Sequence, residues 1–299
     1  MSCCISAAND MPHTPYPCTY RKAGHQYGKL HPNPAACQNQ HTAALLSGEA
    51  MTGDKRHPAD FALWKARKPG EPFWASPWGP GRPGWHIECS AMASAVMGAK
   101  MDIHSGGEDL RFPHHNNELA QSEAYYHQDG CHQWVNYFMH MGHLGIEGLK
   151  MSKSLKNFVT IREALQQVSP RQLRLMFVCT SWDKRIAYGP QLAAEVAAKE
   201  ALLRNFFGNC EVAIREHAIA SGPVRWETEE AALAASIATQ QAAVHAALCN
   251  NIDTGSAMDA LCELVKQVNL YLADRAKSVA TGGACQPLLC WAVPATLIV

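Results

Sequence analysis

The chain has 299 residues, 47% of them hydrophobic and 17% charged, so it can bury a sizeable core and is neither collagen-like nor wholly disordered. Its 26 basic and 26 acidic side chains exclude a protein that holds nucleic acid by bulk positive charge alone. The 12 cysteines show no framework spacing, which favours a reducing compartment. The first residues lack a basic stretch followed by an apolar one, so we expect no secretory signal, and no apolar run reaches the roughly 18 residues of a membrane span. We therefore expect a cytoplasmic protein without a membrane partner.

The N-terminal part of the sequence divides into two segments of different composition. Residues 1–57 are rich in Pro, His, Cys, Asn and Gln without a sustained apolar period, and we expect them to be largely irregular. From Phe61 to Trp85 the sequence is rich in tryptophan and carries clusters of Pro and Gly, which is typical of an ordered loop with tight turns.

The next segment alternates between helical and strand patterns. An apolar helical spacing predicts a helix over 85–97, and a short strand over 101–104 is expected to enter a turn at Gly106-Gly107. Pro113 suits the first turn of a helix that continues to about residue 127. A strand at about 134–141, a lysine-rich loop and a helix at about 160–167 follow.

After about residue 190 the pattern becomes purely helical, and three apolar stripes predict three helices packed as a bundle. We assign these stripes to core packing. Ser256, followed by Asp259 three positions on, is expected to begin the third helix as a capping box. The stripes are formed by Leu192, Val196, Leu203, Phe206, Cys210 and Ile214, by Leu233, Ile237, Val244 and Leu248, and by Met258, Leu261, Val265, Val268 and Leu272.

A candidate metal site begins with His114 and Glu118, which are four residues apart and therefore share one face of the predicted helix. Cys89 from the preceding helix would complete a set of S, N and O donors of the kind that Zn²⁺ accepts. From spacing alone a surface hydrogen bond and a small core cysteine remain the commoner interpretation. His115 is the competing ligand, and because it lies about 100° further round the helix we expect only one of the two histidines to share the face of Glu118.

A second candidate site is the loop Lys150-Met151-Ser152-Lys153-Ser154, which offers two ammonium groups, two hydroxyls and several backbone donors. Such a loop can fold over a polyphosphate, where positive charge stabilises a leaving pyrophosphate. Charge pattern alone favours an ordinary solvated loop, because lysines are common in loops and the sequence has no Walker-type glycine repeat.

The same five residues match letter for letter the second signature motif of the class I aminoacyl-tRNA synthetases. Over about residues 58–190 the chain closely resembles the cysteinyl-tRNA synthetases within that class, and residues up to about 272 resemble the helical domain that follows their catalytic domain. The segments that carry the resemblance are Asp60-Phe61-Ala62-Leu63-Trp64-Lys65, Gly84-Trp85-His86-Ile87-Glu88-Cys89-Ser90-Ala91-Met92, Asp102-Ile103-His104, Phe112-Pro113-His114-His115, Asn117-Glu118-Leu119-Ala120-Gln121-Ser122 and Gly142-His143-Leu144.

This resemblance implies an α/β fold, a partial Rossmann-like class I catalytic domain followed by an α-helical bundle. It implies a ligase that activates L-cysteine with ATP and Mg²⁺ and transfers it to tRNA(Cys). Cys89, His114 and Glu118 fall on three of the family's zinc ligands, and Zn²⁺ would hold the substrate thiolate and separate cysteine from serine. Trp85 would form a wall of the amino-acid pocket.

In the signature loop, the resemblance makes Lys153 the ATP-phosphate contact and Lys150 its assistant, with Met151, Ser152 and Ser154 completing the ATP-binding segment. It divides the chain into an N-terminal segment, 1–57, the later part of the catalytic domain, 58–190, and a helical tRNA-binding domain, 191–299, which we expect to be truncated.

The sequence also departs from the family. The family's first signature, a His-x-Gly-His segment that opens the first helix of the nucleotide fold, is missing from the N-terminal part, where His13, His25, His31 and His41 all lack the following Gly-His. Neither Cys18 nor Cys37 has the flanking residues of the early cysteine that completes the zinc site. In residues 1–57 only Tyr27-Gly28-Lys29-Leu30 resembles the family. We therefore expect a chain without the first half of the catalytic fold, and we expect it to show no cysteine-dependent ATP–pyrophosphate exchange on its own.

Two alternatives stay open from the sequence. A related ligase that joins cysteine to an amino-sugar would share the zinc and lysine motifs, although the helical segment after residue 190 argues against it. A non-catalytic tRNA-binding or interaction protein derived from a truncated synthetase would account for the missing first signature.

Overall fold

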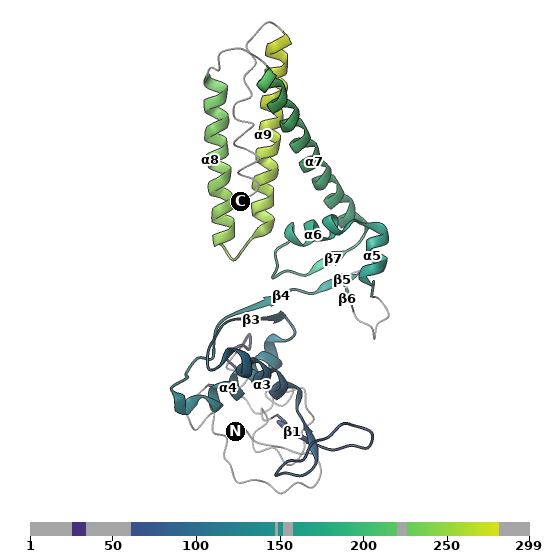
Figure 1. The fold of residues 1–299 in the computed structure, drawn as a ribbon, viewed down its shortest axis with the longest axis vertical. Coiled ribbons are helices and arrows are strands. Elements are labelled where there is room, and N and C mark those ends of the chain that lie inside the picture. Colours follow the sequence, from purple (N-terminus) through teal and green to yellow (C-terminus); the bar gives the residue numbers. More distant parts are fainter. Residues whose placement is uncertain (1–25, 34–60, 147–148, 152–157, 220–225, 281–299) are drawn as a thin grey trace. The chain divides into compact units, whose positions relative to one another are not determined.

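A computed structural model describes residues 26–33, 61–146, 149–151, 158–219 and 226–280 (Figure 1). The chain forms two compact units, Met1–Met141 and Gly142–Val299. Nearly all of residues 1–57 lie outside the described part of the chain, so their predicted irregularity stays a prediction. The domain boundaries predicted at residues 57 and 190 were drawn from the family resemblance and not from the compactness of the fold, and they too stay predictions.

The first unit is built around two parallel strands joined by a helical crossover, with an antiparallel hairpin before them. Strand β3 pairs with β4 in register from Met101 opposite Val135 to Gly107 opposite Met141. Helix α4 runs between these strands and packs against α3 (Figure 1). The elements are β1 (Trp64–Ala66), β2 (Gly81–Pro83), α3 (Trp85–Met97), β3 (Met101–Gly107), the π-helical turn η2 (Arg111–His115), α4 (Asn116–Tyr125), the 3-10 turn η3 (His127–Asp129) and β4 (Val135–Met141).

The core of this unit forms where the two strands begin. Trp134 is fully buried there, and its indole N–H donates to the carbonyl of Gly98 at 3.4 Å. Met101 and Val135 open the two strands beside it, and Leu119 comes from α4. A parallel pair with its crossover helix is the unit from which nucleotide-binding α/β sheets are made, so the α/β prediction is confirmed.

The second unit starts with a small three-stranded sheet and two capped helices. Strand β5 lies centrally, antiparallel to β6 and parallel to β7. Reciprocal side-chain and backbone hydrogen bonds form capping boxes at Thr160 with Glu163 and at Ser169 with Gln172. The elements are β5 (Leu144–Ile146), β6 (Leu149–Lys150), α5 (Ile161–Gln167), α6 (Pro170–Val178) and β7 (Ile186–Tyr188).

Three long helices complete the second unit, and α8 and α9 lie side by side along their length (Figure 1). They are α7 (Pro190–Ile219), α8 (Thr228–Cys249) and α9 (Thr254–Ala280). The predicted stripes form their core, which includes Phe206, Cys210, Leu233, Ile237, Val265 and Val268. The predicted bundle is therefore confirmed.

Three local predictions were wrong. Asp253 caps α9, because its carboxylate accepts from the backbone and side chain of Ser256 at 3.0 and 2.7 Å, whereas Asp259 pairs with Lys199 at 3.3 Å. Gly106 continues β3 instead of forming a turn. Leu248, assigned to the core, is 44% exposed.

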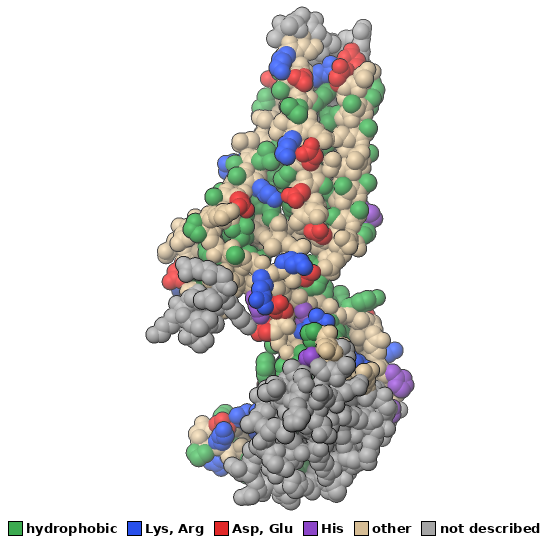
Figure 2. All heavy atoms as spheres, turned by 180° about the vertical axis from the view of Figure 1, so that it is seen from behind, with side chains coloured by type: hydrophobic (Ala, Val, Ile, Leu, Met, Phe, Trp, Pro, Cys, Tyr) green, Lys and Arg blue, Asp and Glu red, His purple; other side chains and the backbone are tan. Residues whose placement is uncertain are grey.

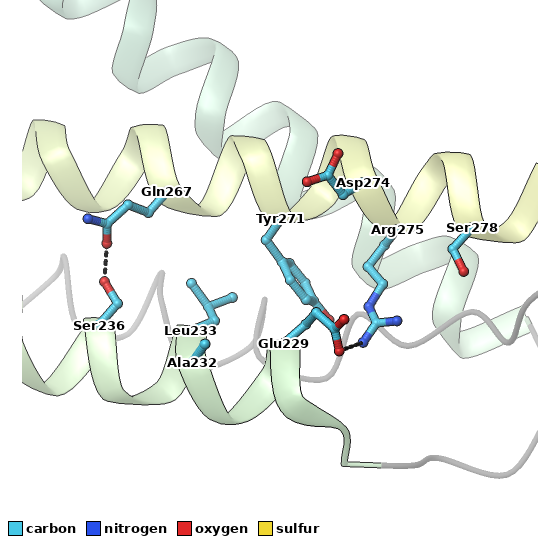
Figure 3. Close-up of a pocket in the computed structure, with 9 residues that line it drawn as sticks. All are labelled: Glu229, Ala232, Leu233, Ser236, Gln267, Tyr271, Asp274, Arg275 and Ser278. Atoms are coloured by element: carbon cyan, nitrogen blue, oxygen red, sulfur yellow. Dashed lines mark hydrogen bonds and ion pairs between the residues drawn. The ribbon is translucent and has the colours of Figure 1, made fainter.

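A cavity of about 450 Å³ lies between α8 and α9 in the second unit. Arg275 of α9 reaches across it and contacts Glu229 of α8 at 3.6 Å (Figure 3). The Arg275 guanidinium also bonds to Glu230, which is fully buried and accepts from the Tyr271 hydroxyl at 2.7 Å. Asp274, which also lines the cavity, pairs with Lys277 at 3.0 Å. Because each charged group that lines the cavity has a partner of opposite charge, we interpret the cluster as structural.

Candidate metal centre

Cys89 reaches the candidate site from the first half of α3. The helix begins after Gly84, whose backbone is extended, and ends at Gly98, whose φ of 75° few other residues adopt. The Cys89 side chain is half-buried. Burial raises the pKa of its thiol, and the negative charges of Glu118 and Glu88 raise it further. A bound cation would act in the opposite sense and favour the thiolate.

His114 comes from η2, the turn between β3 and α4, and Glu118 from the first turn of α4. Phe112 is extended (φ −144°, ψ 131°), and the chain then tightens through η2 into α4. His114 and Glu118 are 4% and 0% exposed. One donor atom each of Cys89, His114 and Glu118 lie within 4.8 Å of one another. The structure therefore brings together the three residues that the sequence selected.

The orientation of His114 is fixed by its two neighbours on α3. Nδ1 of His86 lies 2.8 Å from Nδ1 of His114, and one of the two nitrogens donates to the other. The Trp85 ring stacks on the His114 ring, with centroids 4.2 Å apart and an angle of 22°. Nε2 of His114 thereby points to the carboxylate of Glu118, with a separation of 2.9 Å from Oε1. A hydrogen bond on one ring nitrogen leaves the other in place for a ligand.

The Glu118 carboxylate is buried and only partly satisfied. Its Oε2 accepts from Nε2–H of His104 at 3.0 Å. Its Oε1 makes no hydrogen bond with any residue in the described part of the chain, although Nε2 of His114 is close. Burial raises the pKa of this carboxyl, but the contacts with His104 and His114 outweigh burial and lower its pKa to about 2. Glu118 is thus an anion with one buried oxygen free to bind a cation.

The expectation that only one of the two neighbouring histidines shares the face of Glu118 was wrong. Donor atoms of His104, His115 and Glu118 form a second group within 4.8 Å. Residues three and four positions before Glu118 both lie beside it on a helix, so His115 and His114 approach it together. Burial, followed by repulsion from His104, lowers the pKa of His115 to about 4, so its imidazole is neutral at pH 7.

The sequence did not predict the residues that surround this second group. Nδ1 of His115 lies 2.9 Å from Nε2 of His140, which projects from β4. A Cβ on Gly106 would lie 2.8 Å from Cε1 of His115, so the glycine makes room for the ring against β3. The Asp102-Ile103-His104 motif was the one sequence signal for His104.

The short segment 26–33 packs on α4. The Tyr27 hydroxyl donates to Oδ1 of Asn117 at 2.6 Å, and Lys29 pairs with the buried Glu123 at 2.7 Å. These contacts support α4, which carries Glu118 and begins two residues after His114.

The lysine loop is described only in part. Lys150 ends β6, which pairs with β5, and the amide of Met151 donates to the carbonyl of Leu144 at 3.2 Å. Ser152, Lys153 and Ser154 lie outside the described residues. Their predicted contact with ATP therefore stays a prediction.

The model of the family described as tRNA synthetases class I (C) catalytic domain matches residues 17–198. The chain belongs to this family. Cytoplasmic cysteine–tRNA ligases of Mus musculus and Homo sapiens are each 51% identical to it over 259 residues, covering 84% of the chain and 30% and 34% of the relative. The chain thus spans about a third of the length of these curated relatives. The resemblance inferred from the motifs is confirmed. The family match begins at residue 17, so the expectation that only Tyr27-Gly28-Lys29-Leu30 resembles the family within residues 1–57 was wrong.

A solved structure supports the fold of this synthetase domain. The LeuRS of Agrobacterium radiobacter K84, solved in a ternary complex with tRNA and LeuAMS, has a TM-score of 0.51 and 15% identity, covering 73% of the chain and 30% of LeuRS. At this identity the likeness concerns the fold alone. Within the described residues, no helix has both the length and the apolar character that crossing a membrane requires.

Proposed function

We propose that the chain carries the zinc and lysine-loop half of a cysteine–tRNA ligase, which activates cysteine with ATP as cysteinyl-adenylate, releasing pyrophosphate, and then transfers the cysteinyl group to tRNA(Cys). The observation that carries this proposal is the convergence of Cys89, His114 and the free oxygen of Glu118. The names of the relatives support the ligase over an amino-sugar ligase or a non-catalytic derivative. The same names and the cysteine pattern support a cytoplasmic location.

The donor set fits Zn²⁺. A thiol, an imidazole and a carboxylate within 4.8 Å are ligands that this ion accepts together, and three protein ligands leave a position for a substrate. When bound there, zinc supplies affinity for a thiolate over a hydroxyl, and so separates cysteine from serine. The chain contributes the geometry, because the His86 contact and the Trp85 stack fix the imidazole of His114.

Trp85 is suited to bounding the amino-acid pocket. One face of its ring lies on His114, while the residue as a whole is 55% exposed. A substrate side chain bound beside His114 would therefore meet a rigid aromatic wall. Packing against this wall would exclude water from the thiol and would help to hold the substrate carboxylate in one orientation for attack on ATP.

The lysine loop would provide positive charge at the phosphates of ATP, which enters with Mg²⁺. Lys153 would contact the phosphates and Lys150 would assist it, while Met151, Ser152 and Ser154 shape the loop. As the cysteine carboxylate attacks the α-phosphorus, pyrophosphate leaves and gains negative charge, which the ammonium groups stabilise. Helices α7 to α9 would offer a surface for tRNA(Cys).

The test is metal content and amino-acid binding of the purified 299-residue chain. We expect zinc at about one equivalent, and cysteine binding by calorimetry that serine does not match. Cys89→Ala and Glu118→Gln should lose both. Glu88→Gln is the matched control, because Glu88 is an exposed carboxylate one residue from Cys89 and should change neither. Stoichiometric zinc in Cys89→Ala, or equal binding of serine, would contradict the proposal.

A further inference from the structure

The connection between β1 and β2, here called the β1–β2 loop (residues 67–80), is an ordered projection (Figure 1). Trp74 and Gly81 exchange both backbone hydrogen bonds, at 2.8 and 3.0 Å, and the amide of Arg67 donates to the carbonyl of Pro80 at 3.1 Å. Arg82 donates two hydrogen bonds to the carboxylate of Glu71, at 2.9 and 3.2 Å. The loop is therefore held in one conformation by both its backbone and an ion pair.

This fixed loop presents two aromatic side chains to solvent. Phe73 is 46% exposed and Trp74 is 57% exposed. The guanidinium of Arg67 lies 4.0 Å from the centroid of the Phe73 ring, within the range of a cation–π contact. Adjacent exposed aromatic rings on an ordered loop are typical of a binding surface, because apolar surface left in contact with water is unfavourable until a ligand covers it.

The charge of the loop and its base is positive. This segment contains four basic residues, Lys65, Arg67, Lys68 and Arg82. It contains a single acidic residue, Glu71, which is paired with Arg82. Arg67 and Lys68 are exposed. Lysine and arginine side chains lie together with hydrophobic ones at this projecting edge of the first unit in Figure 2. Because the whole chain is formally neutral, this local excess is a feature of the loop and not of the composition.

We propose that the β1–β2 loop binds unpaired RNA, with bases stacked on Trp74 and Phe73 and with phosphates at Arg67 and Lys68. Exposed aromatic rings beside cations are the arrangement with which proteins hold single strands, since every base has a π face. Base faces are hidden inside a duplex, so the loop should discriminate strongly against paired RNA. Only the source of this RNA, which would be the unpaired end of a tRNA, rests on the proposed function.

The test is fluorescence anisotropy of the zinc-loaded 299-residue chain with a labelled, unstructured oligoribonucleotide and with a blunt duplex of the same sequence. We expect Trp74→Ala to weaken single-strand binding by about fivefold to a hundredfold, the cost of one lost base stack. Phe73→Ala should act in the same direction, and Trp74→Phe should restore most of the affinity. Arg67→Gln should also reduce the salt dependence, by about 0.7 in the slope of log K against log salt.

Two matched controls separate the loop from a general effect. Tyr137 is 71% exposed in the same unit and Lys100 is also exposed there, so Tyr137→Ala and Lys100→Gln should bind RNA as the unmodified chain does. Trp74→Ala should keep the zinc content of the unmodified chain, which is the readout of the metal-site proposal, so the two proposals fail separately. Equal affinity for duplex and single strand, or unchanged binding by both Trp74→Ala and Phe73→Ala, would overturn the inference. The chain could instead self-associate without binding RNA, and lose that self-association in Trp74→Ala. This result would show that the partner of the loop is a protein, and it would also overturn the inference.

Discussion

In the metal-free protein, the buried carboxylate of Glu118 should make stability depend on acid pH. Its pKa is lowered from 4.5 to about 2 by the contacts with His104 and His114, which outweigh the effect of burial. Since the folded form holds this proton less tightly than the unfolded form, the contribution is present above pH 4.5 and is lost as the pH falls towards 2. A difference of about 2.5 pKa units corresponds to about 3 kcal/mol.

The substitution Glu118→Gln removes this titration while it keeps the shape of the side chain. Between about pH 6 and about pH 3 the unmodified protein should lose about 2 kcal/mol of unfolding free energy that the variant does not lose. The slope with pH is the decisive quantity, because the absolute stability at one pH also contains the cost of burying the charge.

The assay is urea unfolding of chelator-treated protein across this pH range, followed by tryptophan fluorescence, to which the fully buried Trp134 in the same unit contributes. Glu88→Gln should reproduce the pH profile of the unmodified protein, because Glu88 is exposed. Parallel profiles for Glu118→Gln and the unmodified protein would show that the carboxylate is not held ionised by the two histidines, and would refute this reasoning.

Three further outcomes are expected. His104→Ala should weaken zinc binding by about tenfold to a hundredfold in a metal titration while leaving the ligands in place, because His104 orients Glu118 by a 3.0 Å hydrogen bond. In a complete enzyme that contains this segment, Lys153→Ala should slow cysteine-dependent pyrophosphate exchange by a factor on the order of 10² without changing zinc content. Arg275→Met should destabilise the helical unit by about 3 to 5 kcal/mol in thermal or urea unfolding, because it leaves the buried Glu230 without its cation.

The elements that the sequence predicted well are those whose limits are set locally. Helix α3 occupies the predicted residues because Gly84 and Gly98 bracket an apolar run, and β4 begins where the predicted strand does, within one residue. The metal donors were found because His114 and Glu118 are spaced by one helical turn. Their proximity to Cys89 needed the family resemblance, since no periodicity links two separate helices.

The features that escaped prediction depend on contacts between distant residues. The His115–His140 pair joins a turn to a strand 25 positions later, and Lys29 meets Glu123 across 94 positions. The cap of α9 was misplaced because Asp253 and Ser256 offer equally plausible capping patterns, and only the backbone decides between them. A single sequence contains no signal for such pairings.

The two oxygens of Glu118 have separate tasks, and this division leads to a last prediction. Oε2 is held by His104 while Oε1 faces His114 without a hydrogen bond among the described residues. Glu118→Asp keeps the charge but shortens the side chain by one C–C bond, about 1.5 Å. An aspartate that keeps the bond to His104 cannot then reach the metal position, so zinc content should fall as far as in Glu118→Gln. Zinc content near that of the unmodified chain in Glu118→Asp would mean that charge, and not the reach of this carboxylate, holds the ion.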